Sequence, residues 1–336
     1  MKVVLAYKNL SAANPVLSHS GLGITAHHGE LSLRAAGIPA EAWAVREGYH
    51  LWAWLAHRPD ITHVVTLAPY LDTPFTERLV RHFSRVRFAM TCHSNVGFLQ
   101  ADRHAVKLLR EGLWLQQRVP NFTVGGNSAK FCEWVEQAYG ARCALLPNLY
   151  HLESADCPHR PLYQDGVLRL GIFGAIRVQK NIMSAAAAAL VIARHASAEN
   201  TEIWVSSDRE EGGQGVMAAV KEMLSRIPRI RLVEAGWHGW REFRQLASRM
   251  HLMLQPSYTE SFNMVTADGV AEGVASVVSS AIDWAPKYWQ ACADTVLDIA
   301  RVGRQLLRDP YAAADGYRAL QAYNRAGLAA WRAHLA

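Results

Sequence analysis

The stretch Gln255–Ser280, QPSYTESFNMVTADGVAEGVASVVSS, carries strand and helix signals in close succession. The apolar residues Leu252–Leu254 end a strand just before it, and a Pro-Ser turn follows. The small and polar residues after Glu260 are expected to open a helix, which Gly273 is placed to close. Another strand begins at Ala275–Val278. A strand–helix–strand unit of this kind is the building block of a parallel α/β sheet.

Two carboxylates in this stretch, Glu260 and Asp268, are eight residues apart. Glu260 precedes the expected helix and projects from its entry turn, whereas Asp268 is expected about two turns inside it. The N–H groups between them are candidates for anion binding, because the first turn of a helix has unpaired donors and a positive dipole end. These candidate groups belong to Ser261, Phe262, Asn263 and Met264. The stretch therefore predicts a diphosphate site.

These residues resemble the sugar-nucleotide signature of retaining GT-B glycosyltransferases of the group 1, or family 4, type. That signature has Pro-Ser, an acid, a small-aromatic pair and a second acid eight residues after the first. The family usually has Glu at both positions, so Asp268 is a departure that shortens the second side chain by one methylene. The resemblance implies that Glu260 contacts the transferred sugar and that Asp268 holds the nucleotide ribose. The alternative is a strand–helix–strand unit with one ordinary glutamate.

A second stretch agrees with the first. Leu168–Gly174 is typical of a buried strand that ends in glycine, and an Ala-rich helix, Ile182–Ala196, follows it. Between these elements the family has Gly-Arg-x-x-x-x-Lys-Gly/Asn, in which the arginine and the lysine bind the donor diphosphate. Lys180, six residues after the glycine, matches this pattern, and so does Asn181.

The arginine of that pattern is missing, because Ala175 occupies its position. Arg177, two residues further on, is the nearest substitute. Lysine and arginine form charge-assisted hydrogen bonds with a diphosphate, which are strong. The alternative is two solvated cations in a strand–helix turn.

The N-terminal half holds weaker signals. A turn with Gly21 and Gly23 follows the first strand and precedes a helix. In the family, a Gly-rich loop here lets the backbone approach the donor phosphate and sugar, since glycine has no Cβ. His93 ends a strand, as a histidine of the family does at the cleft. The resemblance therefore implies Gly21, Gly23 and Gly174 in donor binding and His93 in contact with the transferred sugar. A loop glycine pair and an ordinary polar histidine are the alternatives.

Strand-like and helix-like segments alternate along the chain, which predicts an α/β protein with parallel sheets covered by helices. In the N-terminal half, the expected strands are Val3–Tyr7, Glu41–Val45, Thr62–Leu67, Arg87–Thr91, Phe122–Gly125 and Cys143–Leu146, and the expected helices are Leu22–Ala36, Pro74–Ser84, Asp102–Arg118 and Ser128–Tyr139.

The resemblance implies the GT-B plan, with two Rossmann-like doubly wound domains facing one another across a cleft. We expect an N-terminal acceptor domain at 1–147 and a linker rich in proline and polar residues at 148–166. A C-terminal sugar-nucleotide domain follows at 167–309. In the family the last helix, here 310–336, crosses back to pack on the first domain. A chain of 336 residues is long enough for two such domains.

Composition favours a cytoplasmic enzyme without metal. No apolar run reaches the ~18 residues of a transmembrane helix, and Met1–Tyr7 lacks the pattern of a signal peptide. The five cysteines are scattered without a Cys-x-x-Cys pair, so neither a zinc site nor a disulfide framework is indicated. The Asp-x-Asp motif of metal-bridged diphosphate sites is also missing. We expect no bound cofactor, and a nucleotide sugar such as a UDP-sugar as donor substrate.

Positive charge is concentrated in the N-terminal part of the chain. Residues 1–150 contain 15 Lys and Arg against 10 Asp and Glu, and the remainder contains 20 against 19. Cations interleaved with aromatic rings suit nucleic acid or an anionic lipid surface. Two groups have this character: Arg78, Arg81, His82, Arg85 and Arg87, and the patch Trp52, Trp54, His57 and Arg58.

The acceptor is therefore expected to be anionic. The segment Cys92–Tyr150 loosely resembles phage-encoded relatives, which favours DNA with a hydroxymethylated base that is flipped into the cleft, in a host cytoplasm. A lipid-linked or surface glycan, reached from a membrane surface, is one alternative. A non-catalytic module that binds a sugar nucleotide is another, and Asp268 and Ala175 are the departures that favour it.

Overall fold

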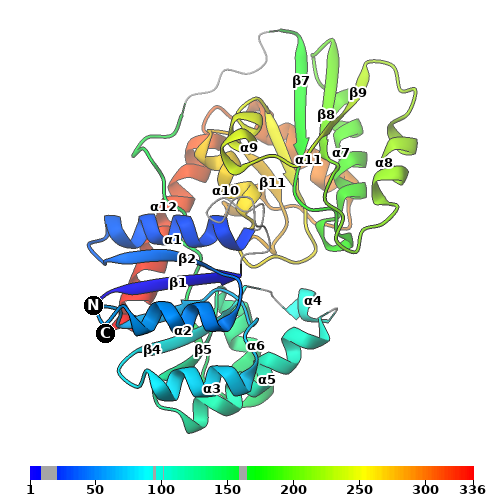
Figure 1. Ribbon diagram of the computed structural model, residues 1–336. Helices are drawn as coiled ribbons and strands as arrows, with labels where there is room; N and C mark the ends of the chain where they lie inside the picture. Colours follow the sequence, from blue (N-terminus) through cyan, green and yellow to red (C-terminus); the bar gives the residue numbers. More distant parts are fainter. Residues whose placement is uncertain (9–20, 94–95, 101, 159–164) are drawn as a thin grey trace. The chain divides into compact units, whose positions relative to one another are not determined.

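The structure is a computed structural model that describes residues 1–8, 21–93, 96–100, 102–158 and 165–336. Its contacts divide the chain into two compact units (Figure 1). The first unit consists of Met1–His151 and Asn324–Ala336, and the second consists of Leu152–Tyr323. Each unit is an α/β structure with its own parallel sheet.

The first unit is built on a six-stranded sheet with the order β2-β1-β3-β4-β5-β6. All its neighbouring strands pair in parallel. Most of the strand residues are buried, as expected for a parallel sheet covered on both faces. The strands are β1 (Val3–Lys8), β2 (Ala40–Val45), β3 (His63–Thr66), β4 (Arg87–Cys92), β5 (Phe122–Gly126) and β6 (Ala144–Leu145).

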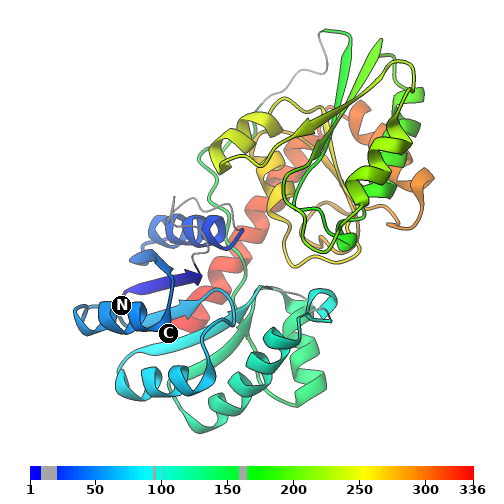
Figure 2. The same ribbon diagram turned by 45° about the vertical axis from the view of Figure 1, so that its right-hand side comes forward.

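Helices cover both faces of the first sheet (Figure 2). One core lies between the sheet and the apolar sides of α2 (Gly48–Ala56), α3 (Thr73–His82), α5 (Arg103–Arg118) and α6 (Ala129–Tyr139). On the other face, α1 (Gly21–Ala35) and the end of α12 (Ala312–Leu335) share a second core. Trp331 and Leu335 of α12 belong to that core, so the last turns of the chain complete the first unit. The short helix α4 (Val96–Leu99) precedes α5.

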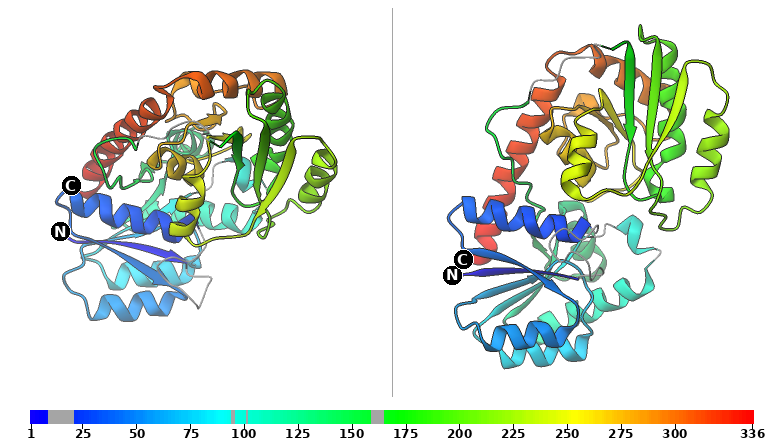
Figure 3. Two further views of the ribbon diagram at one scale, coloured as in Figure 1. Left: turned by 90° about the horizontal axis from the view of Figure 1, so that it is seen from above. Right: turned by 45° about the horizontal axis from the view of Figure 1, so that its top comes forward.

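The second unit contains a five-stranded parallel sheet with the order β11-β10-β7-β8-β9. Figure 3 shows its strands and helices from two further directions. Its strands are β7 (Val167–Ile172), β8 (Asn200–Ser206), β9 (Ile230–Ala235), β10 (Leu252–Gln255) and β11 (Ser276–Val278). Its helices are α7 (Ile182–Arg194), α8 (Val216–Leu224), α9 (Trp240–Ala247), α10 (Met264–Ala271), α11 (Val296–Arg308) and residues 312–323 of α12, with 3₁₀ turns η1 (Val178–Lys180) and η2 (Lys287–Trp289).

The predicted alternation of strands and helices is confirmed, and each expected strand of the first unit lies within two residues of its observed bounds. Helices α2 and α4 of the first unit were not expected, and α2 is the longer of the two. Its sequence, GYHLWAWLA, is apolar almost throughout, so it lacks the helical spacing by which an amphipathic helix is recognised. In each sheet, successive strands are added first on one side of the starting strand and then on the other. This change of side occurs between β1 and β3 in the first unit and between β7 and β10 in the second. Ligands of open α/β sheets bind outside the carboxyl ends of the strands at such reversals.

Candidate active site

Two loops meet where the order of the second sheet reverses. Strands β7 and β10 pair in parallel, with Leu252 opposite Leu170, so both end at the same edge of the sheet. The loop after β7 carries Gly174 and Lys180, and the loop after β10 carries Glu260. The sheet thus brings together the two stretches of sequence that were predicted to bind a diphosphate.

Lys180 and Glu260 form a buried ion pair. The Lys180 Nζ lies 2.6 Å from the Glu260 Oε1, and their side chains are only 14% and 7% exposed. The Asn263 Nδ2 donates a second hydrogen bond to the same carboxylate oxygen, at 3.0 Å. A buried charge of either sign is costly unless it is paired and hydrogen-bonded, and here both conditions are met.

Two asparagines with left-handed backbone conformation hold the loops in place. Asn181 (φ 56°) precedes α7, and Asn263 (φ 66°) precedes α10. Asparagine is one of the few residues other than glycine that adopts this conformation readily. The Asn181 Nδ2 donates to the Pro256 carbonyl at 3.0 Å, which ties the first loop to the second. The Asn263 side chain accepts the Thr266 N–H at 2.8 Å and so caps α10 while it holds Glu260.

Gly174 lies close to both loops. Its φ of 119° is one that residues with a Cβ rarely adopt. A Cβ there would lie 3.8 Å from both the Lys180 Cε and the Val265 Cγ2. The Gly174 N–H donates to the Ser206 Oγ at 3.2 Å. The glycine backbone therefore passes beside the lysine and the first turn of α10.

The helix after Glu260 begins later than expected. We predicted that it opens directly after this acid, but α10 begins at Met264, because Asn263 is its N-cap. Ser261 and Phe262 lie in a bend, and the Phe262 ring is buried against Trp284 at a centroid distance of 5.6 Å. Phe262 therefore supports the loop from the core. The first N–H groups of the helix belong to Met264 and Val265, at the edge where Gly174 also lies.

Asp268 lies on the side of α10 that packs against α9. It is 2% exposed, and its Oδ1 accepts the Trp240 Nε1–H at 2.9 Å. The prediction that it lies about two turns inside the helix is wrong, since Met264 is the first helical residue and Asp268 is only four residues further on. The assignment of Asp268 to the ribose stays a prediction. Trp240 gave no recognisable signal in the sequence.

Trp240→Phe is expected to lower the free energy of unfolding by about 1–3 kcal/mol, because it leaves a buried carboxylate without an indole donor. Chemical denaturation would measure this loss. Trp237→Phe is the matched control, since the Trp237 Nε1–H has no hydrogen-bond partner among the described residues. Equal losses in the two variants would contradict a supporting role for the Trp240–Asp268 bond.

Arg177 pairs with Glu211, in the loop after β8. Its Nε donates to the Glu211 Oε2 at 2.6 Å, and Arg209 pairs with the same carboxyl group. Burial would raise the pKa of Glu211, but the charges of the two arginines outweigh it and lower that pKa. Arg177 thus joins the loop after β7 to the loop after β8. Its predicted contact with a diphosphate stays a prediction.

The predicted site residues of the N-terminal half lie in the first unit. His93 follows β4, and its Nδ1 lies 3.4 Å from the Asn127 Nδ2. Burial lowers the pKa of His93 to about 4, so the imidazole is neutral near pH 7. Gly21 opens α1 and Gly23 is buried within it. The residues that precede Gly21 in the predicted Gly-rich loop lie outside the described part of the chain.

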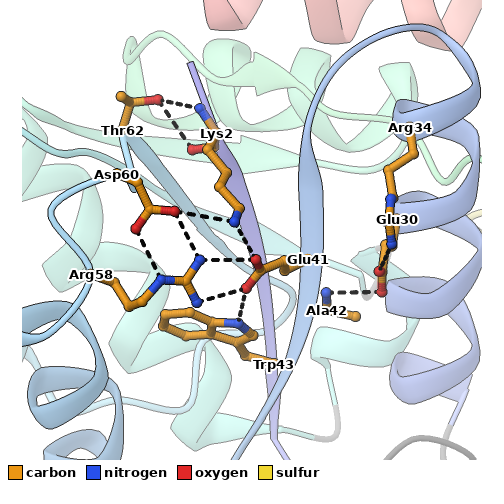
Figure 4. Close-up of polar contacts among 9 residues, drawn as sticks. All are labelled: Lys2, Glu30, Arg34, Glu41, Ala42, Trp43, Arg58, Asp60 and Thr62. Atoms are coloured by element: carbon orange, nitrogen blue, oxygen red, sulfur yellow. Dashed lines mark hydrogen bonds and ion pairs between the residues drawn. The ribbon is translucent and has the colours of Figure 1, made fainter.

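The predicted aromatic-basic patch is divided by the structure. Arg58 is bound by two carboxylates, with its Nη2 2.9 Å from Glu41 and its Nε 2.9 Å from Asp60 (Figure 4). Two carboxylates thus offset the charge of Arg58, and its predicted contact with a polyanion stays a prediction. Trp52 stacks on His82 at 4.6 Å and packs against the core.

One of the arginines near α3, Arg87, lies at the amino edge of the first sheet. Arg87 begins β4, whereas His93 follows its end. A strand of six residues is about 20 Å long. Arg78 and Arg85 are exposed, and Arg81 pairs with Glu77 at 2.8 Å. Arg87 is therefore separated from the carboxyl edge, where ligands of parallel sheets bind.

Neither a metal cluster nor a membrane span is found in the described part of the chain. Its residues contain no group of three or more His, Cys, Asp or Glu placed to hold a metal ion. No helix among them combines the length and apolar character needed to cross a membrane.

The chain is similar in structure to several known enzymes, although no protein-family model and no curated protein matches its sequence. The sucrose-phosphate synthase of Thermosynechococcus elongatus matches with a TM-score of 0.68 and 15% identity, over 99% of this chain and 98% of its own. The UDP-forming α,α-trehalose-phosphate synthase of Burkholderia xenovorans, in complex with glucose-6-phosphate, matches with 0.64 and 12%, over 100% and 99%.

A mutant of S. aureus TarM, in complex with fondaparinux, α-GlcNAc-glycerol and UDP, matches with a TM-score of 0.57 and 13% identity. The match covers 80% of this chain and 54% of that one, so the chain spans about half the length of TarM. Identities this low establish the fold alone. The predicted GT-B fold is confirmed as two α/β domains with parallel sheets of six and five strands.

Proposed function

We propose that this protein is a retaining glycosyltransferase that takes its sugar from a nucleotide-sugar donor and needs no metal ion. The observation that carries the proposal is the buried Lys180–Glu260 pair at the reversal of the second sheet. Two of the similar structures support a nucleotide donor. The TarM mutant holds UDP, and the trehalose-phosphate synthase is UDP-forming. The signature around Glu260 and Lys180 supports the same class.

In the proposed reaction the acceptor hydroxyl attacks the anomeric carbon on the face that the diphosphate leaves. The bond from that carbon to the diphosphate oxygen breaks, and a bond to the acceptor oxygen forms. The departing phosphate oxygen takes the hydroxyl proton. Glu260 would hydrogen-bond the sugar and stabilise the positive charge that develops on it. Lys180 and the first N–H groups of α10 would stabilise the diphosphate, since preorganised donors act where charge develops.

Lys180 must take on a further partner for this to happen. Its ammonium group has three donors, so it can keep Glu260 while it binds a phosphate oxygen. Arg177 is paired with Glu211 through its Nε and Nη2, so that pair holds part of its guanidinium group. We therefore assign the main cationic role to Lys180 and a secondary one to Arg177.

Activity is expected to survive excess EDTA, because the described residues offer no carboxylate cluster to bridge a cation to the diphosphate. Initial rates of nucleoside diphosphate release with and without chelator would test this. Complete loss in EDTA with recovery in Mg²⁺ or Mn²⁺ would refute the metal-free mechanism.

For the acceptor we propose a long polyanion, with DNA as the favoured case and a lipid-linked or surface glycan as the alternative. The exposed Arg78, Arg85 and Arg87 support a polyanion. Because Arg87 lies about 20 Å from the carboxyl edge of β4, an acceptor that contacts both places must be long. A small anion bound to Arg87 would not reach His93.

The triple variant Arg78→Gln/Arg85→Gln/Arg87→Gln is expected to weaken binding of duplex DNA and leave donor binding unchanged. The dependence of log Kd on log salt should also become shallower, by about 0.9 for each phosphate that an arginine no longer neutralises. A labelled duplex titrated at two ionic strengths would measure both effects. Arg34→Gln is the control, because Arg34 lies on α1 and pairs with Glu30 (Figure 4). Absence of DNA binding by the wild type at low salt would favour the glycan.

A further inference from the structure

One face of α11 forms a groove lined by arginines. The groove has a volume of about 520 Å³ and is lined by Arg301, Arg304, Gln305, Arg308 and Asp309. These positions are spaced by three and four residues, so they share one side of the helix. The opposite side of α11 is buried, with Gly303 so close to Ile192 of α7 that a Cβ would lie 2.6 Å from its Cδ1. Figure 1 shows α11 and α7 in the second unit.

Two of the three guanidinium groups are not neutralised by a neighbour. Arg301 is held by Asp298, with its Nη2 2.8 Å from the Oδ1. Arg304 and Arg308 have no carboxylate within ion-pair distance among the described residues. The Nε of Arg304 is shielded from solvent and has no hydrogen-bond partner in that part of the chain. A guanidinium donor without a partner costs free energy, which favours binding of an anion by the other N–H groups of Arg304.

The helix dipole accounts for only part of this arrangement. Arg308 lies in the last turn of α11, where a cation is favoured by the carbonyl end of the helix. Arg304 lies a full turn earlier, and the dipole effect falls off within the last turn. The dipole also does not explain why Arg304 and Arg301 line the same hollow. A bound anion would account for the position of Arg304 before the last turn and for the hollow that it shares with Arg301.

We propose that this groove binds a small anion that carries two or more phosphoryl groups. Guanidinium groups bind phosphate through paired, charge-assisted hydrogen bonds. From Arg301 to Arg308 the helix rises by about 10 Å. This length fits a small anion with two phosphoryl groups better than a polymer.

This site shares no residue with the proposed donor site, and it has a structural connection to it. The Asn181 Nδ2, which ties the donor loops together, also donates to the Ala293 carbonyl at 2.8 Å. Ala293 lies just before α11, whereas Arg308 ends that helix about 18 Å further along. A ligand at the arginine groove would thus bind the helix that follows the contact between Ala293 and the donor loops.

Calorimetric titration with inorganic pyrophosphate at constant ionic strength tests the proposal. The wild type should bind at two sites, one in the groove and one at the donor loops. Arg304→Gln/Arg308→Gln should weaken the groove site by at least about tenfold, because it removes two guanidinium groups that would hydrogen-bond the anion. Lys180→Ala should weaken only the other site. Arg318→Gln/Arg325→Gln, which removes two exposed arginines of α12, is the charge-matched control and should keep both sites.

The outcomes separate the two proposals. A single wild-type site that is abolished in Lys180→Ala and kept in the groove variant would overturn the groove. A single site that is kept in Lys180→Ala and lost in the groove variant would support the groove and count against the donor site. Arg304→Lys/Arg308→Lys guards against misfolding, since it keeps the charge and removes only the paired geometry. Its affinity for pyrophosphate should lie between those of the wild type and the Gln variant. Unchanged pyrophosphate binding by both groove variants would also overturn the inference.

Discussion

Lys180→Ala is expected to reduce kcat/KM for sugar transfer by about 30- to 150-fold. The change removes one charge-assisted hydrogen bond to the departing diphosphate, equivalent to roughly 2–3 kcal/mol of transition-state stabilisation. Steady-state kinetics with the preferred donor would measure it. Lys221→Ala is the matched control, because Lys221 forms only an exposed ion pair with Glu234 on the surface. A kcat/KM for Lys180→Ala within a few-fold of the wild type would show that the diphosphate binds elsewhere.

The same variant leaves Glu260 buried without its cation, so its stability must be measured as well. Lys180→Ala should be less stable than the double variant Lys180→Ala/Glu260→Gln, in which no buried charge remains. This comparison separates a loss of catalysis from a loss of fold. If both proteins unfold at the wild-type denaturant concentration, the activity loss can be attributed to the donor site alone.

Glu260→Gln is expected to have the larger kinetic effect, a decrease in kcat of about 100- to 1,000-fold, with little change in KM for the donor. Glutamine keeps the size of the side chain and can still accept from the Asn263 Nδ2, but it lacks the charge that stabilises a developing oxocarbenium ion. Glu234→Gln, at an exposed carboxylate, is the control. A rise in KM with unchanged kcat would mean that Glu260 binds the donor without acting on the transition state.

The centre of the site could be predicted from the sequence because two rules reinforce each other. Lys180 and Glu260 each follow an apolar strand, and parallel strands place their carboxyl ends at one edge. The signature then indicated which polar residues at that edge matter. Their contact at 2.6 Å depends on β7 and β10 being neighbours, which the structure shows.

The surroundings of the site could not be predicted, because long-range contacts decide them. Trp240 reaches Asp268 across 28 residues, and Arg177 reaches Glu211 across 34. Neither pair has a spacing that a local pattern would indicate. The late start of α10 depends on the left-handed backbone of Asn263, which propensities do not specify.

Closeness in sequence was also misleading for the acceptor side. Arg87 and His93 are six residues apart, yet a strand separates them by about 20 Å, at opposite edges of the first sheet. Arg58 and Asp60 are even closer, and their ion pair offsets positive charge in the predicted patch. Net charge in the sequence therefore predicts that an interaction surface is positive. It does not predict where that surface lies relative to the strand ends.

The most direct test of the donor site is the release of nucleoside diphosphate and free sugar from a panel of nucleotide sugars, without acceptor and in EDTA, followed by proton NMR. We predict that at least one donor is hydrolysed above its uncatalysed rate, that the first sugar released keeps the anomeric configuration of the donor, and that Glu260→Gln loses this activity. Release at the same rate by Glu260→Gln, or no release from any donor, would contradict the account.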